Sequence, residues 1–263
     1  MKKQDIPSPD KVIIAKLARA AKGGLLSVTS ASLAFGLPRR TTSMKLAALA
    51  RRGLYFVLPL EAEPGRPATP DDPWVVAREA FSPCYIGGWS AAEHWGLTEQ
   101  LFRSTFVLTA AHVRRQTTQL LGHEFRLFRV PRARIEAATL IWRGTERVPV
   151  SDRECTIVDC LRHPELCGGV RHLADIMREY GSSAERDFTK LLDAARRGAN
   201  GAAWKRFGYL AELLWPEEIR LAEEAQEHLT AGVAKLDSAV RQRGSPNRCW
   251  RLWMNVTIAE KTT

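Results

Sequence analysis

The chain lacks the features that mark membrane proteins, disulfide frameworks and metal sites. Its longest stretch without a charged residue, 23–38, is shorter than the roughly 20 apolar residues of a membrane span. The N-terminus has no apolar run that would read as a secretory signal. The five cysteines include no CxxC pair, and the six histidines form no HxH or HExxH pair. We therefore expect a cytoplasmic protein with free thiols, no membrane contact, no metal and no cofactor.

Common enzyme signatures are also missing. None of the lysines has Asp or Glu two positions before it, as restriction-type nucleases require, and no two aspartates form the DxD pair of nucleotidyl transfer. The stretches GGWS and CGGVR match neither Walker A nor GxGxxG, and GWSAA lacks the closing glycine of a nucleophile elbow. We therefore assign no catalytic residues and predict that the chain is not an enzyme.

Positive charge is abundant but unevenly distributed. Residues 1–60 contain eleven Lys or Arg and two acidic residues, so they hold +9 of the formal net charge of +10. A basic module attached to a nearly neutral body is typical of a protein that approaches a polyanion, because each neutralised phosphate releases counterions. DNA, RNA and an anionic membrane are the possible partners at this stage.

The pattern within residues 1–60 favours DNA. Apolar residues at helical spacing predict a helix over 10–22, and SVTSASLAFGL predicts a second helix with Leu33 pointing inward and a turn at Gly36. A third helix has Pro38 in its first turn, and 54–59 has the composition of a strand. This order predicts a winged helix-turn-helix domain, in which the second helix of the motif enters the major groove.

The third predicted helix carries the candidate DNA contacts. With Thr42, Leu46 and Leu49 facing inward, its outward face holds basic and hydroxyl side chains: Arg39, Arg40, Thr41, Ser43 and Lys45. The two arginines suit base edges, and the other three suit phosphates or base edges equally well. The alternative is a basic three-helix domain that docks on a protein. A membrane-surface helix is disfavoured because the first helix lacks a bulky aromatic face.

A linker separates this module from a larger second domain. Residues 61–73, EAEPGRPATPDDP, contain four prolines and no bulky apolar side chain, which predicts domains at 1–60 and 74–263. The second domain is predicted to be α+β. Its expected helices are WVVAREAF, WSAAEHWG, a helix after a Ser151/Glu154 capping box, and four more between about 170 and 230; its expected strands are CYI, 105–110, 124–130, 134–142, 147–150 and WRLWMNVTI.

The segment YIGGWSAAEHWGL, 85–97, is the most distinctive in the body. We interpret its tryptophans as packing anchors, because an indole buries a large apolar area and needs only one hydrogen-bond acceptor. The adjacent glycines permit a tight strand-to-helix turn. His94 next to Glu93 does not by itself make a catalytic triad.

The order of these motifs resembles a known family. A basic winged helix followed by YIGGWSAAEHWGLTEQ, strands, RECTIVDCLRHPELCGG and WKRFGYLAELL resembles the AbiEi antitoxins of type IV toxin-antitoxin systems over essentially the whole chain. The resemblance implies a repressor of its own operon, with the Arg39/Arg40 helix recognising inverted repeats in the promoter and two copies on the DNA. The second domain would counteract an AbiEii-type nucleotidyltransferase toxin, without direct contact being implied.

Several body residues fall within the matching motifs: Trp89, Ser90, Trp95, Gly96, Asp159, Gly208 and Tyr209. We favour burial over a direct binding role for them. Two other functions stay open. One is a winged-helix transcription regulator without a toxin partner. The other is a divergent nuclease or toxin-modifying enzyme in the second domain, for which Asp159 is the carboxylate to replace.

Overall fold

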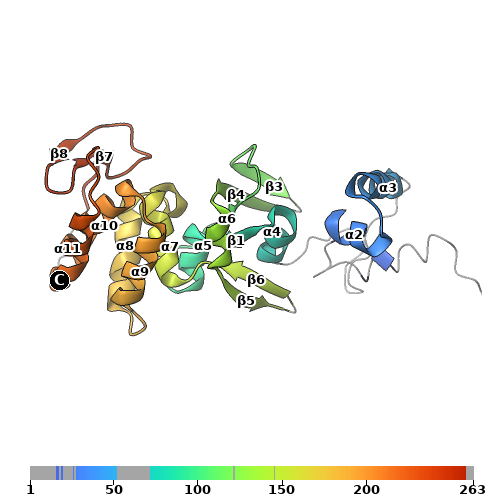
Figure 1. Cartoon of the computed structure of the whole chain (residues 1–263), viewed down its shortest axis with the longest axis horizontal. Coiled ribbons are helices and arrows are strands. Elements are labelled where there is room, and N and C mark those ends of the chain that lie inside the picture. Colours follow the sequence, from blue (N-terminus) through green and yellow to red (C-terminus); the bar gives the residue numbers. More distant parts are fainter. Residues whose placement is uncertain are drawn as a thin grey trace, which may run out of the picture.

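The computed structural model describes residues 16, 17, 19, 26, 28–51, 72–120, 122–144 and 146–258. This part of the chain is mixed α/β, with ten α-helices and a six-stranded sheet (Figure 1). Most of the predicted helix 10–22, the whole predicted strand 54–59 and most of the predicted linker lie outside the described residues. No helix within these ranges combines the length and the hydrophobicity that a membrane span needs.

Helices α2 (Val28–Phe35) and α3 (Arg39–Arg51) pack on one another across a short turn. Gly36 adopts a φ of 62°, in the left-handed region that glycine enters without steric cost. Ala31 and Thr42 are both fully buried. The predicted inward position of Leu33 is wrong, since its side chain is 81% exposed. Leu33 lies two residues from Ala31, about 200° around the helix, so burying Ala31 turns Leu33 outward.

The body is built on a mixed sheet with the order β3-β4-β2-β1-β6-β5. Its strands are β1 (Cys84–Ile86), β2 (Ser104–Thr109), β3 (Thr117–Leu120), β4 (His123–Arg129), β5 (Thr139–Arg143) and β6 (Glu146–Val150). Strand β1 runs antiparallel to β2 and parallel to β6, and β2 runs parallel to β4. Alternate side chains therefore face two cores, one on each side of the sheet.

Helices cover both faces of this sheet (Figure 1). Helix α4 (Pro73–Phe81) packs on the face that carries Ile86 and Val107. The opposite face, which carries Tyr85 and Phe106, packs against the larger helical layer. That layer contains α5 (Gly88–His94), α7 (Arg153–Arg162), the 3-10 helix η1 (Pro164–Cys167), α8 (Val170–Ser182), α9 (Phe188–Gly198), α10 (Gly201–Leu214) and α11 (Ile219–Glu227).

A small second sheet closes the described chain. Its strands are β7 (Ala234–Lys235), β8 (Ser245–Asn247) and β9 (Leu252–Met254), in the order β7-β9-β8. It is joined to the helical layer by Trp250 and Leu252, which belong to the larger core. The predicted strand WRLWMNVTI is thus confined to three residues.

Three further local predictions need correction. Residues 134–142 are not one strand, because helix α6 (Arg132–Glu136) starts after Pro131, whose fixed φ suits a helix start, and β5 begins only at Thr139. The cap of α7 is Asp152, not Ser151: its Oδ1 accepts from the Cys155 N–H at 2.6 Å. Helix α4 begins at Pro73, the last residue of the predicted linker. Strand β3, TTQL, was not expected, because it has no hydrophobic alternation.

Candidate nucleic-acid interface

The turn between α2 and α3 positions the candidate recognition helix. The Leu37 N–H donates to the Ser32 carbonyl at 3.1 Å, which closes the end of α2. The Thr42 hydroxyl lies 3.2 Å from the carbonyl of Pro38, to which it donates. Thr42 is therefore buried for both packing and hydrogen bonding, and it fixes which face of α3 turns outward.

All five predicted contact residues lie on the exposed part of α3. Arg39, Arg40, Thr41, Ser43 and Lys45 are exposed, whereas Thr42 is buried and Leu46 is half-buried. Helix α3 contains no acidic residue, and within the described part of the chain Arg39, Arg40 and Lys45 make no ion pair. The positive end of the helix dipole adds to these charges at the helix start. An anion approaching the start of α3 meets charges that no carboxylate of the described residues pairs with.

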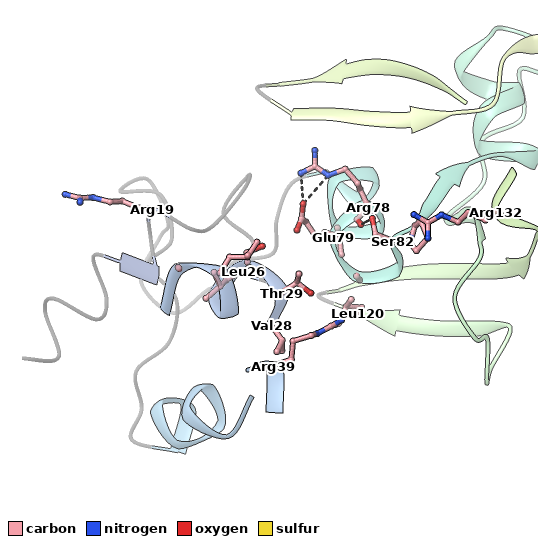
Figure 2. A pocket seen from close by; sticks show the side chains of 16 residues that line it. Arg19, Leu26, Val28, Thr29, Arg39, Arg78, Glu79, Ser82, Leu120 and Arg132 are labelled. Carbon is pink, nitrogen blue, oxygen red and sulfur yellow. Dashed lines mark hydrogen bonds and ion pairs between the residues drawn. The ribbon is translucent and has the colours of Figure 1, made fainter. Parts of the chain in front are cut away.

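A basic hollow of about 1200 Å³ adjoins this helix start. Figure 2 shows four arginines around it: Arg19, Arg39, Arg78 and Arg132. Arg78 differs from Arg39 because ion pairs to Glu79 at 2.7 Å and Glu146 at 2.9 Å hold it. Sequence reasoning missed Arg78 and Arg132, since they belong to the second domain and no local motif marks them.

The two indole N–H groups and the Ser90 hydroxyl of the 85–97 segment bond to the protein backbone. The Trp89 Nε1–H donates to the Gln100 carbonyl at 2.9 Å, and the Trp95 Nε1–H donates to the Ser151 carbonyl at 2.7 Å. The Ser90 Oγ accepts from the Phe106 N–H at 3.0 Å. These side chains tie α5 to β2 and to the start of α7, and the geometry assigns them packing roles.

Two glycines of the distinctive motifs are required by close packing. Gly88 has a φ of 55°, and a Cβ placed on it would lie 2.7 Å from the Leu166 carbonyl oxygen. A Cβ on Gly208 would lie 1.9 Å from Cζ3 of Trp250. Gly96 differs, because its φ of 68° suits glycine but the space around it is open. Tyr209 is half-buried and packs against the larger core.

Asp159 is part of a closed buried network. Its carboxylate accepts from the Tyr85 hydroxyl at 2.7 Å and forms an ion pair with Arg134. Arg134 and Arg162 also donate to the Gly198 carbonyl, at 3.0 and 2.7 Å. Burial raises the pKa of Asp159, and Arg134 opposes that change. Burial, followed by the Asp159 charge, raises the pKa of Tyr85 well above its ordinary value.

A cavity of about 240 Å³ lies beside this network. Cys155 lines it, but burial raises the pKa of that thiol to about 12, so it stays protonated. Arg134, at its wall, is engaged by Asp159 and Gly198. Sequence reasoning did not find this network, because Arg134 was assigned to a strand and Tyr85 to the glycine motif.

His94 is a neutral, packed side chain of the body. Burial, followed by the charges of Arg143 and Arg153, lowers the pKa of His94, so its ring is neutral at pH 7. It packs edge-on against Trp74, with ring centroids 5.4 Å apart. In the described ranges no three His, Cys, Asp or Glu side chains gather closely enough to hold a metal ion.

Comparisons with known proteins show a similarity to a solved structure. No protein-family model matches the chain, and no curated protein matches it. The chain is similar to the crystal structure of RV2827C protein from Mycobacterium tuberculosis, with 18% sequence identity and a TM-score of 0.49. The match covers 95% of this chain and 92% of that one. At this identity and TM-score, the similarity supports no statement about function.

Proposed function

We propose that this chain is a DNA-binding repressor and antitoxin of the AbiEi type. Helices α2 and α3, as part of a winged helix-turn-helix domain, bind inverted repeats in the chain's own promoter. The body counteracts a nucleotidyltransferase toxin. The observation that carries the DNA-binding half is the start of α3, where Arg39, Arg40 and Lys45 are exposed without an acidic partner in the described chain. The antitoxin half rests on the motif resemblance.

The geometry of α3 suits double-stranded DNA. Its first turn presents two arginines, which pair with guanine O6 and N7, and hydroxyls at 41 and 43 that pair with phosphates. The neighbouring hollow adds further basic side chains beside the helix start. A binding face of this kind is positioned by phosphate contacts and made specific by the arginines.

A gel shift with the promoter upstream of the chain's own gene tests this proposal. The variants are Arg39→Ala/Arg40→Ala and a matched control, Arg114→Ala/Arg115→Ala, which removes the same charge from another adjacent, exposed arginine pair. At about 1–3 kcal/mol per contact, the first variant should lose about 100-fold or more in operator affinity. The control variant should change operator affinity only slightly, through its effect on the electrostatic field of the whole protein.

A salt series separates specific from non-specific binding. Wild-type binding should weaken with a log-log slope of about −0.9 per phosphate contacted. If both double variants lose affinity equally, net charge and not α3 is responsible, and the assignment of the recognition helix fails. If the wild type shows no preference for its promoter over random DNA, the basic module is a protein-docking surface.

Growth assays test the antitoxin half separately. The chain is expressed together with the neighbouring nucleotidyltransferase-like gene under inducible promoters that lack the native operator. The wild type and Arg39→Ala/Arg40→Ala should both restore growth, because the body carries neutralisation. If the neighbouring genes encode no such toxin, the chain is a regulator alone. If the double variant fails to restore growth while it is folded and abundant, the two activities are not separable.

A further inference from the structure

The two edges of the six-stranded sheet differ in a way that the proposed function does not use. Strand β3, at one edge, is polar (TTQL), whereas β5, at the other, is TLIWR. Natural edge strands are usually protected by charged side chains, proline or a bulge. The one charged side chain of β5 is that of Arg143, which forms an ion pair with Asp72 at 2.7 Å. Figure 1 shows β5 at the lower border of the sheet, and no described strand pairs with its outer side. This edge has the composition of a strand that pairs with another chain.

Exposed apolar side chains lie along the same strand. Leu140 is 55% exposed and Trp142 is 63% exposed, and they share one face of β5 because strand side chains alternate. The next strand continues this face, with Pro149 opposite Leu140 and Arg147 opposite Trp142. The Arg147 guanidinium lies 4.5 Å from the Trp142 ring centre. The opposite face of β5 is different, since Ile141 packs into the core under α4.

The register of the β5–β6 hairpin shows which backbone groups point outward. Arg143 pairs with Glu146 across a two-residue loop, and a hairpin of this length closes on a hydrogen-bonded pair. Residues 139, 141 and 143 therefore direct their N–H and C=O groups toward β6. Leu140 and Trp142 direct theirs to the open side. Pro149 agrees with this pattern, because opposite Leu140 its missing N–H costs no bond to β5.

We propose that the outer edge of β5 is an interface for a second copy of this chain, paired antiparallel about a two-fold axis at Ile141. In this register Leu140 and the partner's Trp142 exchange two backbone hydrogen bonds, and symmetry repeats the exchange. The same pairing brings the apolar side chains of both copies together on one face. All five residues of each strand are paired.

The number of paired residues and the charges select this register over its neighbours, because an axis at Leu140 or Trp142 pairs only three of the five residues of each strand. With the axis at Ile141, Arg143 faces the partner's Thr139, so no like charges are opposed. Moving the axis to Arg143 sets two arginines directly against each other, which is destabilising. Moving it to Thr139 removes Trp142 from the paired region. The strand is therefore complementary to itself in one register, as a two-fold interface requires.

The size of the contact sets its strength. Covering Leu140 and Trp142 removes roughly 250 Å² of apolar surface per chain, compared with about 800 Å² in a standard interface. The association is therefore weak, and it should be measured at high protein concentration. Dimerisation through β5 needs no DNA, so a failure to dimerise can be distinguished from a failure to bind the promoter.

Site-directed cross-linking tests the register. A Cys249→Ser background removes the one exposed native thiol in the described chain. In the proposed pair the two residues at 141 are not hydrogen-bonded to each other, so their Cα atoms lie about 4.5 Å apart, within disulfide range. Ile141→Cys should then form an intermolecular disulfide with dissolved oxygen as the electron acceptor. Leu101→Cys is the control, because position 101 is 82% exposed and favours random collision.

Sedimentation equilibrium tests the association itself. The wild type should dimerise reversibly, with a dissociation constant below about 1 mM, which is the upper limit for weak specific association. Trp142→Lys should raise the dissociation constant at least tenfold while its circular dichroism stays unchanged, since the side chain is largely exposed. Its melting temperature should fall only slightly, because the introduced lysine faces Arg147. The proposal is overturned by a monomeric wild type at 1 mM, by a Trp142→Lys variant that dimerises normally, or by cross-linking at 141 no faster than at 101.

Discussion

Helices α3 and α10 each carry a pair of adjacent cations, and the surroundings of these two pairs are opposite. Arg39 and Arg40 begin α3 and are exposed, without an acidic partner in the described chain. Lys205 and Arg206, in α10, are 2% and 4% exposed. The Arg206 guanidinium donates to the carbonyls of Leu161, Lys235 and Leu236 at 2.8 to 3.0 Å.

The difference shows that the surroundings of two adjacent cations, and not their sequence, decide their role. Lys205 donates to the Thr230 hydroxyl at 2.9 Å and to the Gly232 carbonyl, so both buried cations hold the segment that follows α11. Burial lowers the pKa of each. Where backbone oxygens surround a cation, it stabilises the fold; where none do, as on α3, it can bind an external anion.

The largest expected effect is in the buried pair. Arg206→Met keeps the aliphatic stem but leaves several buried carbonyls without donors, at about 1–3 kcal/mol for each one that stays dry. We expect the free energy of unfolding to fall by about 3 kcal/mol or more, measured by urea denaturation. Arg40→Met is the matched change on α3 and should stay within about 0.5 kcal/mol. If the two variants lost equal unfolding free energy, the buried pair would contribute no more to stability than the exposed pair.

Lys205→Met should have a smaller effect than Arg206→Met. Lys205 has two acceptors, and one of them, the Thr230 hydroxyl, can turn to another partner. A loss of about 1–2 kcal/mol in unfolding free energy is expected. Hydrogen exchange of the amides near 230–235 should rise more than that of α7. A uniform increase over the whole body would show that the lysine does not act locally.

Thr42→Val tests the turn that orients the exposed pair Arg39 and Arg40. The substitution keeps the buried volume but removes the hydroxyl that donates to the Pro38 carbonyl. We expect a loss of about 1 kcal/mol, confined to α2 and α3 and visible in exchange of their amides. Operator affinity should fall with it, because the direction of the arginines depends on this turn. Unchanged affinity would mean that the DNA itself orders the helix start.

The smallest expected effect is on the pH dependence of stability, and it comes from His172, whose partly buried ring stays neutral. Burial lowers the pKa of His172, whose ring stacks on Trp89 at 4.3 Å. Since the folded pKa is below the unfolded value near 6.5, stability is complete above pH 6.5 and is lost as the pH falls below it. His172→Phe keeps the stack and should reduce this slope between pH 7 and 5. The slope should not vanish, because His94 is shifted in the same direction.

Local signals in the sequence predicted most of the body's helices. Asp187 and Asn200 cap α9 and α10 with their side chains, and the apolar spacing after them follows the helical period. Prediction failed where two local rules competed. Asp152 caps α7 although Ser151 and Glu154 have capping-box spacing, since Ser151 instead contacts Thr156 at 2.7 Å and Glu154 accepts from Tyr180.

The tertiary partners of Arg206 and Asp159 could not be predicted from the local sequence. Nothing near Arg206 in the sequence shows that its acceptors are at 161 and 235–236, and nothing near Asp159 points to Tyr85 or Arg134. The exposed face of α3 was easier to predict, because Thr42 is the one hydroxyl residue there that lies on the apolar stripe. Its neighbours Thr41 and Ser43 are exposed, as that stripe requires.

The contact between Gly208 and Trp250 has a consequence for the order in which the nascent chain folds. Trp250 is 1% exposed and lies against the glycine of α10, so the core around that helix is incomplete until residue 250 has left the ribosome. Helices α2 and α3 emerge some two hundred residues earlier and contact each other locally. During synthesis, the exposed cations of α3 are therefore presented to solvent while the body behind them is still unfinished.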